Sequence, residues 1–356
     1  MRQLARIVTI EKLDKHPNAD RLQIAQVGLW NVVTASGTHE IGSSAIFLEI
    51  DSMLPISDER FAFLAGRKDY VVNGITYARL KTIRLRGVLS QGLLVPADLF
   101  EKEIAQFKNP DNTLSLHEIL GVIKYEPPED NVGGSNRIKT PGNTKPFPSF
   151  IPKTDQERIQ NLVYEYKECA NSKELFEITY KLDGSSITIY ANNNKLGVCS
   201  RNLELPLSQD WSDWSNSESH FIKAALEEGL LFKLALAYTK LKHNFAIQGE
   251  LVGPGIQSNF EGLDKHEIYI FDVYDIDNQR YMTPQGRQAF LEDLGIKQVP
   301  LFKYASLDED INETLKMADG PSGLNGEFRE GLVFKSLFRD FSFKAISNSY
   351  LEKTGK

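Results

Sequence analysis

Short runs of β-branched and apolar residues, separated by Gly, Asn and Pro, recur through the first hundred residues of this chain. No long amphipathic helix interrupts them, so the chain cannot begin as a helical bundle. Spacings of 10 to 20 residues between such runs are typical of a small barrel. The expected strands are 6–10, 22–27, 31–34, 45–50, 77–86 and 92–95. We therefore predict a β-barrel domain over residues 1–105.

The pattern changes twice after the barrel. Residues 106–148 are rich in Asn, Pro, Gly and Lys, which predicts a linker. Residues 149–356 then mix strands with helices, as an α+β domain built on antiparallel sheets requires. Its first helix is expected over 154–166, because Thr154 and Glu157 form the pattern of a capping box. Later helices are expected at 221–241, 285–294 and 307–318, and strands at 175–181, 186–191, 245–251, 268–274, 331–335 and 341–345.

Composition excludes several classes of protein. The chain has 356 residues, is 41% hydrophobic and has two cysteines, Cys169 and Cys199, in no Cys-x-x-Cys pair. A disulfide scaffold and a cysteine zinc site are therefore not expected, and the economical location is a reducing cytoplasm. No apolar run approaches the ~18 residues of a membrane span. The net charge of −7 argues against nucleic acid, although residues 1–100 are slightly basic and leave room for a local basic surface.

The residues with chemical potential lie in the second half. Lys181 ends an expected strand, Asp183 enters the turn after it, and Gly184 would let the backbone approach a phosphate. Alone, Lys-x-Asp-Gly is also an ordinary hairpin turn. It is followed in order by Arg201, Glu250 at the end of a strand, Phe271 within a strand, Glu330-Gly331-Leu332-Val333-Phe334-Lys335, and Lys344. Such an ordered set in one region is difficult to assign to chance.

Together these motifs resemble the covalent nucleotidyltransferase superfamily of ATP-dependent ligases and mRNA capping enzymes. The resemblance implies that Lys181 attacks the α-phosphorus of the nucleotide, with Asp183 as its partner. It implies that Glu250 faces ribose or metal, that Glu330 is linked to metal, and that Phe271 stacks on the base. Gly184, Arg201, Lys335 and Lys344 would bind the nucleotide, the two lysines facing phosphate. The run Gly249-Glu250-Leu251-Val252-Gly253-Pro254-Gly255-Ile256-Gln257 looks like the nick-sealing RNA ligase branch.

The N-terminal region carries a second resemblance. The run His16-Pro17-Asn18-Ala19-Asp20-Arg21-Leu22 and residues 83–94 are similar to the signature of OB-fold tRNA-binding modules. An OB domain before an RNA-ligase domain resembles the fifth RNA ligase family. The run Arg79, Lys81, Arg84 and Arg86 on a predicted barrel strand could bind nucleic acid. Equally, these residues could lie on an edge strand that faces solvent.

Three positions stay open on sequence grounds. Arg158 could reach a triphosphate or face solvent, and Trp211 and Trp214 could stack on nucleic acid or pack against the domain. The family pattern usually has Glu before the nucleophile, where this chain has Tyr180. The last motif is often Lys-x-Lys, whereas here Ser342 and Ile346 flank Lys344 at that spacing, which removes one expected phosphate contact.

The chemistry implied by the resemblance requires ATP and a divalent metal. A lysine is almost fully protonated at neutral pH, so neighbouring positive charge, from Mg²⁺ or Mn²⁺ and Lys344, should lower its pKa. Asp183, Glu250 and Glu330 are the expected metal ligands. The sequence thus predicts an AMP-forming RNA ligase that repairs nicks in duplex RNA or an RNA–DNA hybrid, with no membrane or obligatory protein partner. The alternatives are a GTP-using capping-type guanylyltransferase, although a second OB domain is not expected after Lys344, and a non-catalytic tRNA- or RNA-binding protein.

Overall fold

The computed structural model describes residues 3–66, 69–126, 144–208, 210, 217, 219–325 and 327–354. It divides into two compact units, one of residues 1–127 with 351–356, and one of residues 128–350. Trp211, Trp214 and residues 127–143 of the expected linker lie outside the described residues. Among those described, no helix is long and apolar enough to cross a membrane.

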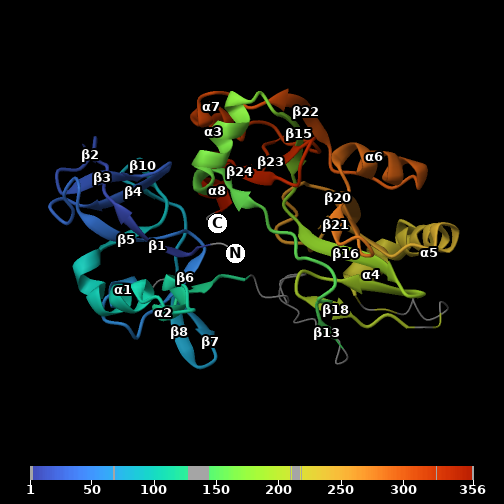
Figure 1. The fold of residues 1–356 in the computed structure, drawn as a ribbon, viewed down its shortest axis with the longest axis horizontal. Helices are drawn as coiled ribbons and strands as arrows, with labels where there is room; N and C mark the ends of the chain where they lie inside the picture. Colours follow the sequence, from blue (N-terminus) through green and yellow to red (C-terminus); the bar gives the residue numbers. More distant parts are fainter. Residues whose placement is uncertain are drawn as a thin grey trace. The chain divides into compact units, whose positions relative to one another are not determined.

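The first unit is built mainly of short antiparallel strands (Figure 1). Its strands are β1 (Ala5–Thr9), β2 (Lys12–Lys15), β3 (Leu22–Val27), β4 (Trp30–Ala35), β5 (Ser44–Leu48), β6 (Ser52–Pro55), β7 (Asp69–Val72), β8 (Ile75–Arg79), β9 (Ile83–Leu85), β10 (Val88–Ser90), β11 (Leu93–Pro96) and β12 (Ile123–Lys124). They form sheets in the orders β1-β5-β11, β2-β3-β4, β10-β9 and β12-β6-β8-β7. The strands at 6–10, 22–27, 31–34, 45–50 and 92–95 are present to within two residues.

This first unit extends past the expected boundary at residue 105. Helices α1 (Glu101–Lys108) and α2 (Leu116–Ile119) and strand β12 occupy the first part of the expected linker. Ser115 begins α2 with a true capping box, and Leu116 and Leu120 are buried in the same core as Phe61 and Phe100. β12 pairs with β6. Polar composition therefore misplaced the linker, because a few apolar side chains suffice to attach this segment to the barrel unit.

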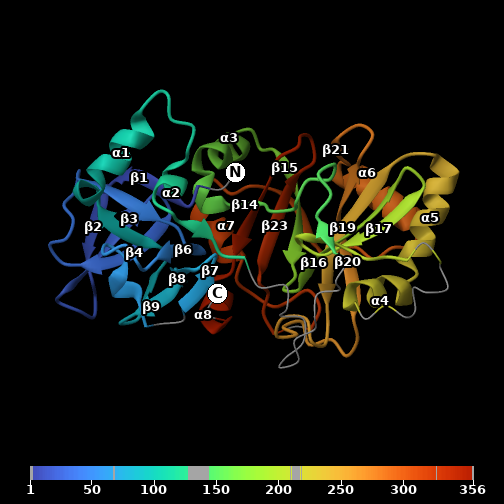
Figure 2. The ribbon, with the colours of Figure 1, turned by 90° about the horizontal axis from the view of Figure 1, so that it is seen from below.

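The second unit contains two mainly antiparallel sheets with helices packed on them (Figures 1 and 2). Its elements are β13 (Lys145–Pro146), β14 (Glu157–Arg158), α3 (Val163–Asn171), β15 (Leu175–Lys181), β16 (Ser185–Asn192), β17 (Lys195–Cys199), β18 (Leu203–Leu205), α4 (His220–Glu227), α5 (Leu230–Leu241), β19 (Phe245–Val252), β20 (Glu267–Asp275), β21 (Arg280–Tyr281), α6 (Pro284–Asp293), β22 (Leu301–Ser306), α7 (Ile311–Met317), β23 (Gly331–Ser336) and β24 (Ser342–Ile346). Helix α8 (Asn348–Thr354) begins in this unit, and its last four residues belong to the first. The predicted α+β architecture is confirmed.

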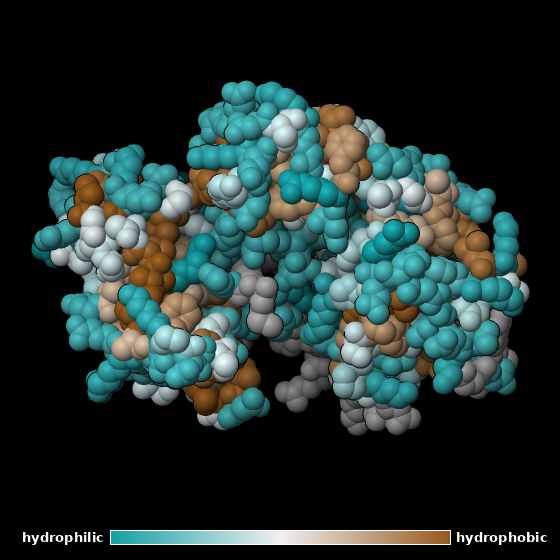
Figure 3. Space-filling model, viewed as in Figure 1, coloured by the Kyte–Doolittle hydropathy of each residue, from teal (hydrophilic) through white to brown (hydrophobic). Residues whose placement is uncertain are grey.

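One sheet has seven strands in the order β13-β18-β17-β16-β19-β20-β21, and the other has five in the order β14-β24-β23-β15-β22. The main core of the unit lies between the seven-stranded sheet and helices α4, α5 and α6. Helix α5 leaves Phe232, Leu236 and Leu241 exposed. Figure 3 shows brown surface in the region of this helix. A smaller apolar cluster around Leu182, Val252 and Val299 joins the ends of β15 and β19. Through this cluster the two sheets pack against each other near the end of β15.

Three expected helices differ from the structure, and the smallest difference is that the one expected at 307–318 begins only at Ile311. The expected helix 221–241 is two helices, because Gly229 adopts a left-handed conformation with φ of 68° between α4 and α5. The expected helix 154–166 begins only at Val163. Residues 157 and 158 form β14 instead, and they pair in parallel with Phe343 and Lys344 on β24. Pairing with a strand far along the chain overrides the local capping pattern.

Candidate active site

Lys181 lies at the end of β15, where the register of the five-stranded sheet places it beside a carboxylate. Lys181 is paired with Gly331 on β23, so the preceding residue, Glu330, comes next to it. The Lys181 Nζ atom donates to Glu330 Oε2 at 2.8 Å. Their side chains are 24% and 14% exposed. The strand pairing therefore holds an accessible ammonium group against one fixed carboxylate.

Glu250 reaches the same place from the other sheet. Strand β19 pairs with β16 so that Glu250 lies opposite Ser186, and Glu250 Oε1 accepts from the Gly184 N–H at 3.1 Å. A Cβ atom on Gly184 would lie 2.3 Å from the Leu251 carbonyl oxygen. Glycine is therefore required here for contact between the turn and β19, and not only for the phosphate approach that the sequence suggested. Burial, with Glu330 and Asp183 nearby, raises the pKa of Glu250 to about 7 despite the opposing effect of Lys181.

The turn after Lys181 is held by a residue that the sequence did not indicate. Asp183 is buried, and its N–H donates to Glu261 Oε1 at 3.3 Å. Glu261 is 1% exposed, and its Oε2 accepts from the Ser322 hydroxyl at 2.8 Å. Glu261 belongs to no family motif quoted from the sequence. Its only signal was a charged residue in the glycine-rich segment after Glu250.

The carboxylates dominate the electrostatics of Lys181. Burial alone would lower the pKa of its ammonium, but Glu330, Glu250 and Asp183 outweigh that effect and raise the pKa above its ordinary value. This is opposite to the lowered pKa that a nucleophilic lysine needs. Among the protein's own groups the balance thus favours the ammonium, and positive charge added at the carboxylates would lower the pKa of Lys181.

A second basic group adjoins this cluster. Lys344 on β24 donates to Asp155 Oδ1 at 2.9 Å, and the Arg201 guanidinium, just after β17, lies 4.0 Å from Asp155 Oδ2. Burial lowers the pKa of Lys344 to about 8, and the charges of Arg158 and Lys181 act in the same direction. Arg158 is buried on β14 beside Lys344, which rules out the solvent-facing helix position considered for it.

Lys335 and Phe271 are joined in a buried network between the two sheets. Lys335 Nζ contacts Asp272 Oδ1 at 2.6 Å and donates to the Phe271 carbonyl at 2.6 Å. Arg287 donates to the same carbonyl at 3.0 Å and forms an ion pair of 2.6 Å with Glu177. Burial lowers the pKa of Lys335. Lys335 therefore anchors the backbone of Phe271 here, where the sequence suggested only contact with phosphate.

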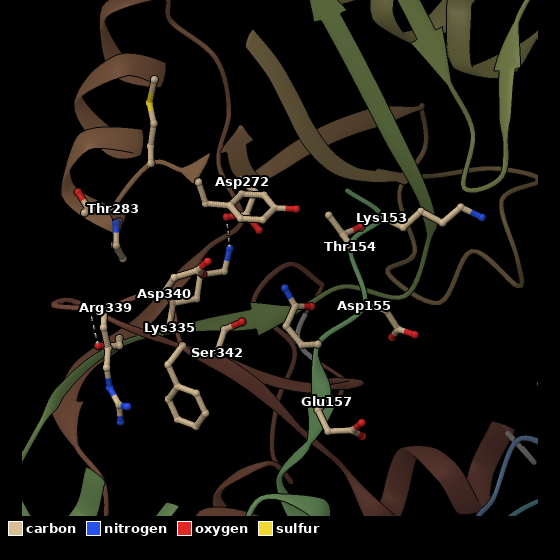
Figure 4. A pocket seen from close by; sticks show the side chains of 16 residues that line it. Lys153, Thr154, Asp155, Glu157, Asp272, Thr283, Lys335, Arg339, Asp340 and Ser342 are labelled. Carbon is tan, nitrogen blue, oxygen red and sulfur yellow. Dashed lines mark hydrogen bonds and ion pairs between the residues drawn. The ribbon is translucent and has the colours of Figure 1, made fainter. Parts of the chain in front are cut away.

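A cavity of about 250 Å³ opens beside this network (Figure 4). It is lined by Asp272 on β20, by Lys335 and Ser342 on β23 and β24, and by residues 153–157. Figure 4 shows the side chains of Lys335 and Asp272 pointing toward one another in the wall of the cavity. Asp155 belongs both to this lining and to the contacts of Lys344, so the cavity adjoins the basic side chains Lys344 and Arg201.

The carboxylates fit a divalent cation that keeps water or phosphate ligands. In the described part of the chain, no group of three or more His, Cys, Asp or Glu side chains is arranged to enclose a metal ion. Mg²⁺ and similar ions, however, are usually held by one or two carboxylates together with substrate phosphates. Burial, and after it the charges of Glu330 and Asp183, disfavour the charged form of Glu250, and a bound cation would stabilise that charged form.

The four basic residues expected to bind nucleic acid are not on one strand. Arg79 ends β8, where its guanidinium bonds to Asp51 at 2.5 Å and lies 3.7 Å from the Tyr125 ring centre. Lys81 lies between β8 and β9. Arg84 on β9 and Arg86 in the following turn are exposed, and Arg84 forms an ion pair with Glu352. Arg79 is thus committed to the fold, whereas Arg86 is presented on a turn.

The motif that resembles tRNA-binding modules supports this turn. His16 is buried and contacts the Leu85 carbonyl at 3.1 Å through Nε2, and Asn18 donates to the Arg86 carbonyl at 2.9 Å. Arg86 and Gly87 have φ of 46° and 90°, the left-handed pair that closes a tight hairpin. The side chains of the motif therefore hold the β9–β10 hairpin in place.

Comparisons with known proteins agree with this arrangement. The RNA ligase family model matches residues 174–346, and an OB-fold domain model matches residues 4–97. An apo variant of Naegleria gruberi RNA ligase is 38% identical, with a TM-score of 0.82 over 99% of this chain and 98% of that one. A lysine variant of that ligase with ATP and Mn is 38% identical, with a TM-score of 0.81 over 99% of both chains. The same ligase with PPi gives 38% and 0.82 over 100% of this chain and 99% of the other. No curated protein matches the chain.

Proposed function

The chain belongs to the RNA ligase family, and we propose that it uses ATP to seal 3′-OH/5′-phosphate nicks in duplex RNA or RNA-containing duplex. The observation that carries this proposal is the strand-end Lys181 held at 2.8 Å by Glu330, with Glu250 and Asp183 beside it. A related ligase was solved with ATP and Mn and with PPi, which supports ATP as the donor of AMP and pyrophosphate as the first product.

The first step needs Lys181 as a neutral amine. Its Nζ atom attacks the α-phosphorus of ATP, so a P–N bond forms while the bond to the β-phosphate oxygen breaks and pyrophosphate leaves. The amine proton is lost to solvent or to a neighbouring carboxylate, of which Glu330 is the nearest along the hydrogen bond. Splitting the reaction through a covalent intermediate is the general advantage of a nucleophilic side chain.

The next two steps transfer AMP and join the strands. The 5′-phosphate oxygen of the RNA attacks the lysyl-AMP phosphorus, which returns the Lys181 amine. The 3′-OH then attacks the activated 5′-phosphate, a phosphodiester bond forms and AMP leaves. Activation matters because a phosphate joined to AMP carries a good leaving group, whereas a free phosphate monoester does not.

The other site residues bind and orient the reactants. Lys344, Arg201 and Arg158 form a basic group suited to phosphate oxygens, with Lys344 and Arg201 sharing Asp155. The nucleotide base would stack on Phe271, whose ring packs against the apolar cluster of Leu182 and Val252 and whose carbonyl is held by Lys335. One or two of the carboxylates Asp183, Glu250 and Glu330, together with the substrate phosphates, would hold Mg²⁺ or Mn²⁺. The bound ion would supply positive charge that stabilises the phosphates and lowers the pKa of the lysine.

The barrel unit serves as a docking module for the duplex. Its exposed Arg84 and Arg86 lie on the β9–β10 hairpin, which His16 and Asn18 hold rigid. A fixed basic hairpin suits contact with a phosphate backbone. The two cysteines are free and buried, which agrees with the proposal that the protein works in a reducing cytoplasm.

Sealing of labelled nicked duplexes tests the proposal. We expect ligation of an RNA nick with ATP and Mn²⁺ or Mg²⁺, and none with GTP. Arg86→Ala should bind the duplex less tightly and with a smaller salt slope, by about 0.9 for each phosphate that the variant no longer neutralises. A lysyl-GMP adduct formed from GTP, with no strand joining, would favour the capping-type alternative. No lysyl-AMP and no ligation, with tight RNA binding, would favour a non-catalytic binding protein.

A further inference from the structure

Glu261 is a buried carboxylate close to the reacting lysine that the proposed chemistry does not use. It lies in the segment between β19 and β20, is 1% exposed, and has both oxygens engaged, by the Asp183 N–H at 3.3 Å and the Ser322 hydroxyl at 2.8 Å. Burial raises its pKa, so the charged form is disfavoured there. Burying a carboxylate costs free energy unless hydrogen bonds compensate for the lost hydration.

The backbone around Glu261 is shaped to bring it under Asp183. Gly253 and Gly262 adopt φ of 130° and 62°, values that favour glycine. A Cβ atom on Gly253 would lie 2.5 Å from the Lys265 carbonyl oxygen, and one on Gly262 would lie 2.6 Å from Asn325. Asn325 in turn donates to the Phe260 carbonyl at 3.2 Å. The segment with Glu261 is thus fastened directly to the segment with Ser322.

The Ser322 segment is itself fixed to the residue before Glu330. The Arg329 guanidinium is buried and donates to the carbonyls of Met317, Ala318, Asp319 and Pro321 at 2.7 to 3.2 Å. It also lies 5.5 Å from the ring centre of Tyr180, which precedes Lys181. Contacts therefore run in a closed loop from Asp183 through Glu261, Ser322 and Arg329 to Glu330 and back to Lys181.

From this loop of contacts we infer that Glu261 is a positioning residue for the nucleotidyl transfer, an inference that rests on the proposed function. Its two hydrogen bonds fix the position of the Asp183 turn relative to the segment that leads to Glu330. They thereby hold Lys181 beside the carboxylates of Glu330 and Glu250. Glu261 is not a metal ligand, because its oxygens are buried and already bonded. Misplacement of a reacting group by about 1 Å can cost about 100-fold in rate.

Rapid-quench measurement of lysyl-AMP formation, over a range of ATP concentrations, tests this role. We expect Glu261→Ala to form the adduct 10- to 100-fold more slowly, with the half-saturating ATP concentration changed less than threefold. Glu261→Gln keeps an acceptor for the Asp183 N–H and should restore the rate to within about threefold. The matched control is Glu267→Ala at the start of β20, a partly buried glutamate bonded to Tyr269 and Lys297, which should react like the wild type.

The outcomes separate the inference from the function on which it rests. A wild-type protein that forms no adduct removes the proposed function itself. If the wild type reacts and Glu261→Ala reacts equally fast, only the positioning role is overturned. The positioning role is also overturned if Glu261→Gln is as slow as Glu261→Ala, because the effect would then be due to the charge of Glu261. If Glu261→Ala does not fold, Ser322→Ala decides, because it removes one of the two bonds. A loss of three- to tenfold is expected there, and the wild-type rate would contradict the inference.

Discussion

Replacing Glu250 by Gln should make the protein more stable above neutral pH while reducing its activity. Burial and the neighbouring carboxylates raise the pKa of Glu250 from about 4.5 to about 7. The folded state therefore binds a proton that the unfolded state has already released between these two values. The stability associated with that proton is complete below about pH 4.5 and is lost as the pH rises through about 7. Glutamine does not titrate and should not show this loss.

The size of the effect follows from the shift in pKa. One pKa unit corresponds to about 1.36 kcal/mol, so the full shift would amount to roughly 3 kcal/mol. Glu250 is only partly buried and is coupled to Lys181, which reduces the value to about 1 to 3 kcal/mol. For a unit of this size, that corresponds to roughly 2 to 12 °C in Tm. The advantage of Glu250→Gln over the wild type should therefore grow by several degrees from pH 5 to pH 8.

Thermal unfolding at pH 5 and pH 8 measures this difference directly. Glu267→Gln is the control, because hydrogen bonding to Lys297 lowers the pKa of Glu267, so its substitution should give no gain at pH 8. Mn²⁺ should raise the Tm of the wild type at pH 8 more than that of Glu250→Gln, since an ion relieves the same repulsion. If the wild type and Glu250→Gln have the same difference in Tm at both pH values, the argument that burial and the neighbouring carboxylates raise the pKa of Glu250 is refuted.

Three further changes follow from the same contacts. Glu177→Ala leaves the buried Arg287 without its carboxylate and should lower the free energy of unfolding in urea by about 3 to 5 kcal/mol. The control Glu309→Ala, in the exposed pair with Lys173, should leave that free energy unchanged. Glu330→Ala should lose most nick sealing and need more Mn²⁺ for its remaining activity, and a wild-type metal titration would disprove its role. Ser342→Lys should alter reaction with ATP more than sealing of a preadenylylated nick, because Ser342 and Lys344 share a face of β24. Equal changes in both assays would place residue 342 away from pyrophosphate.

The strands that carry the site could be predicted because their patterns are local. The run 175–181 is β15 to the residue, and 245–251 and 268–274 lie within β19 and β20. Lys181, Glu330 and Glu250 are brought together as the order of motifs implied. Each stands at or beside a strand end, and a strand end can be located from alternating residues followed by a turn.

The contacts that complete the site depend on residues distant in the sequence. Glu157 and Arg158 form a strand only because β24 is available as a partner, and this pairing cannot be read from a capping pattern. Glu261 acquires its partners from two other segments, near Asp183 and Ser322. The role of Lys335 depends on Asp272 and the Phe271 carbonyl across the sheets. The requirement for glycine at position 184 likewise comes from β19, whose backbone leaves no room for a side chain there.

The central claim is that Lys181 is the residue that accepts AMP, and mass spectrometry of the intact protein tests it. After incubation with ATP and Mn²⁺, the wild type should gain the mass of one AMP, and peptide mapping should locate it on Lys181. Lys181→Ala should gain none while keeping the wild-type circular dichroism spectrum. An adduct on another residue, or an equal adduct on Lys181→Ala, would contradict the account.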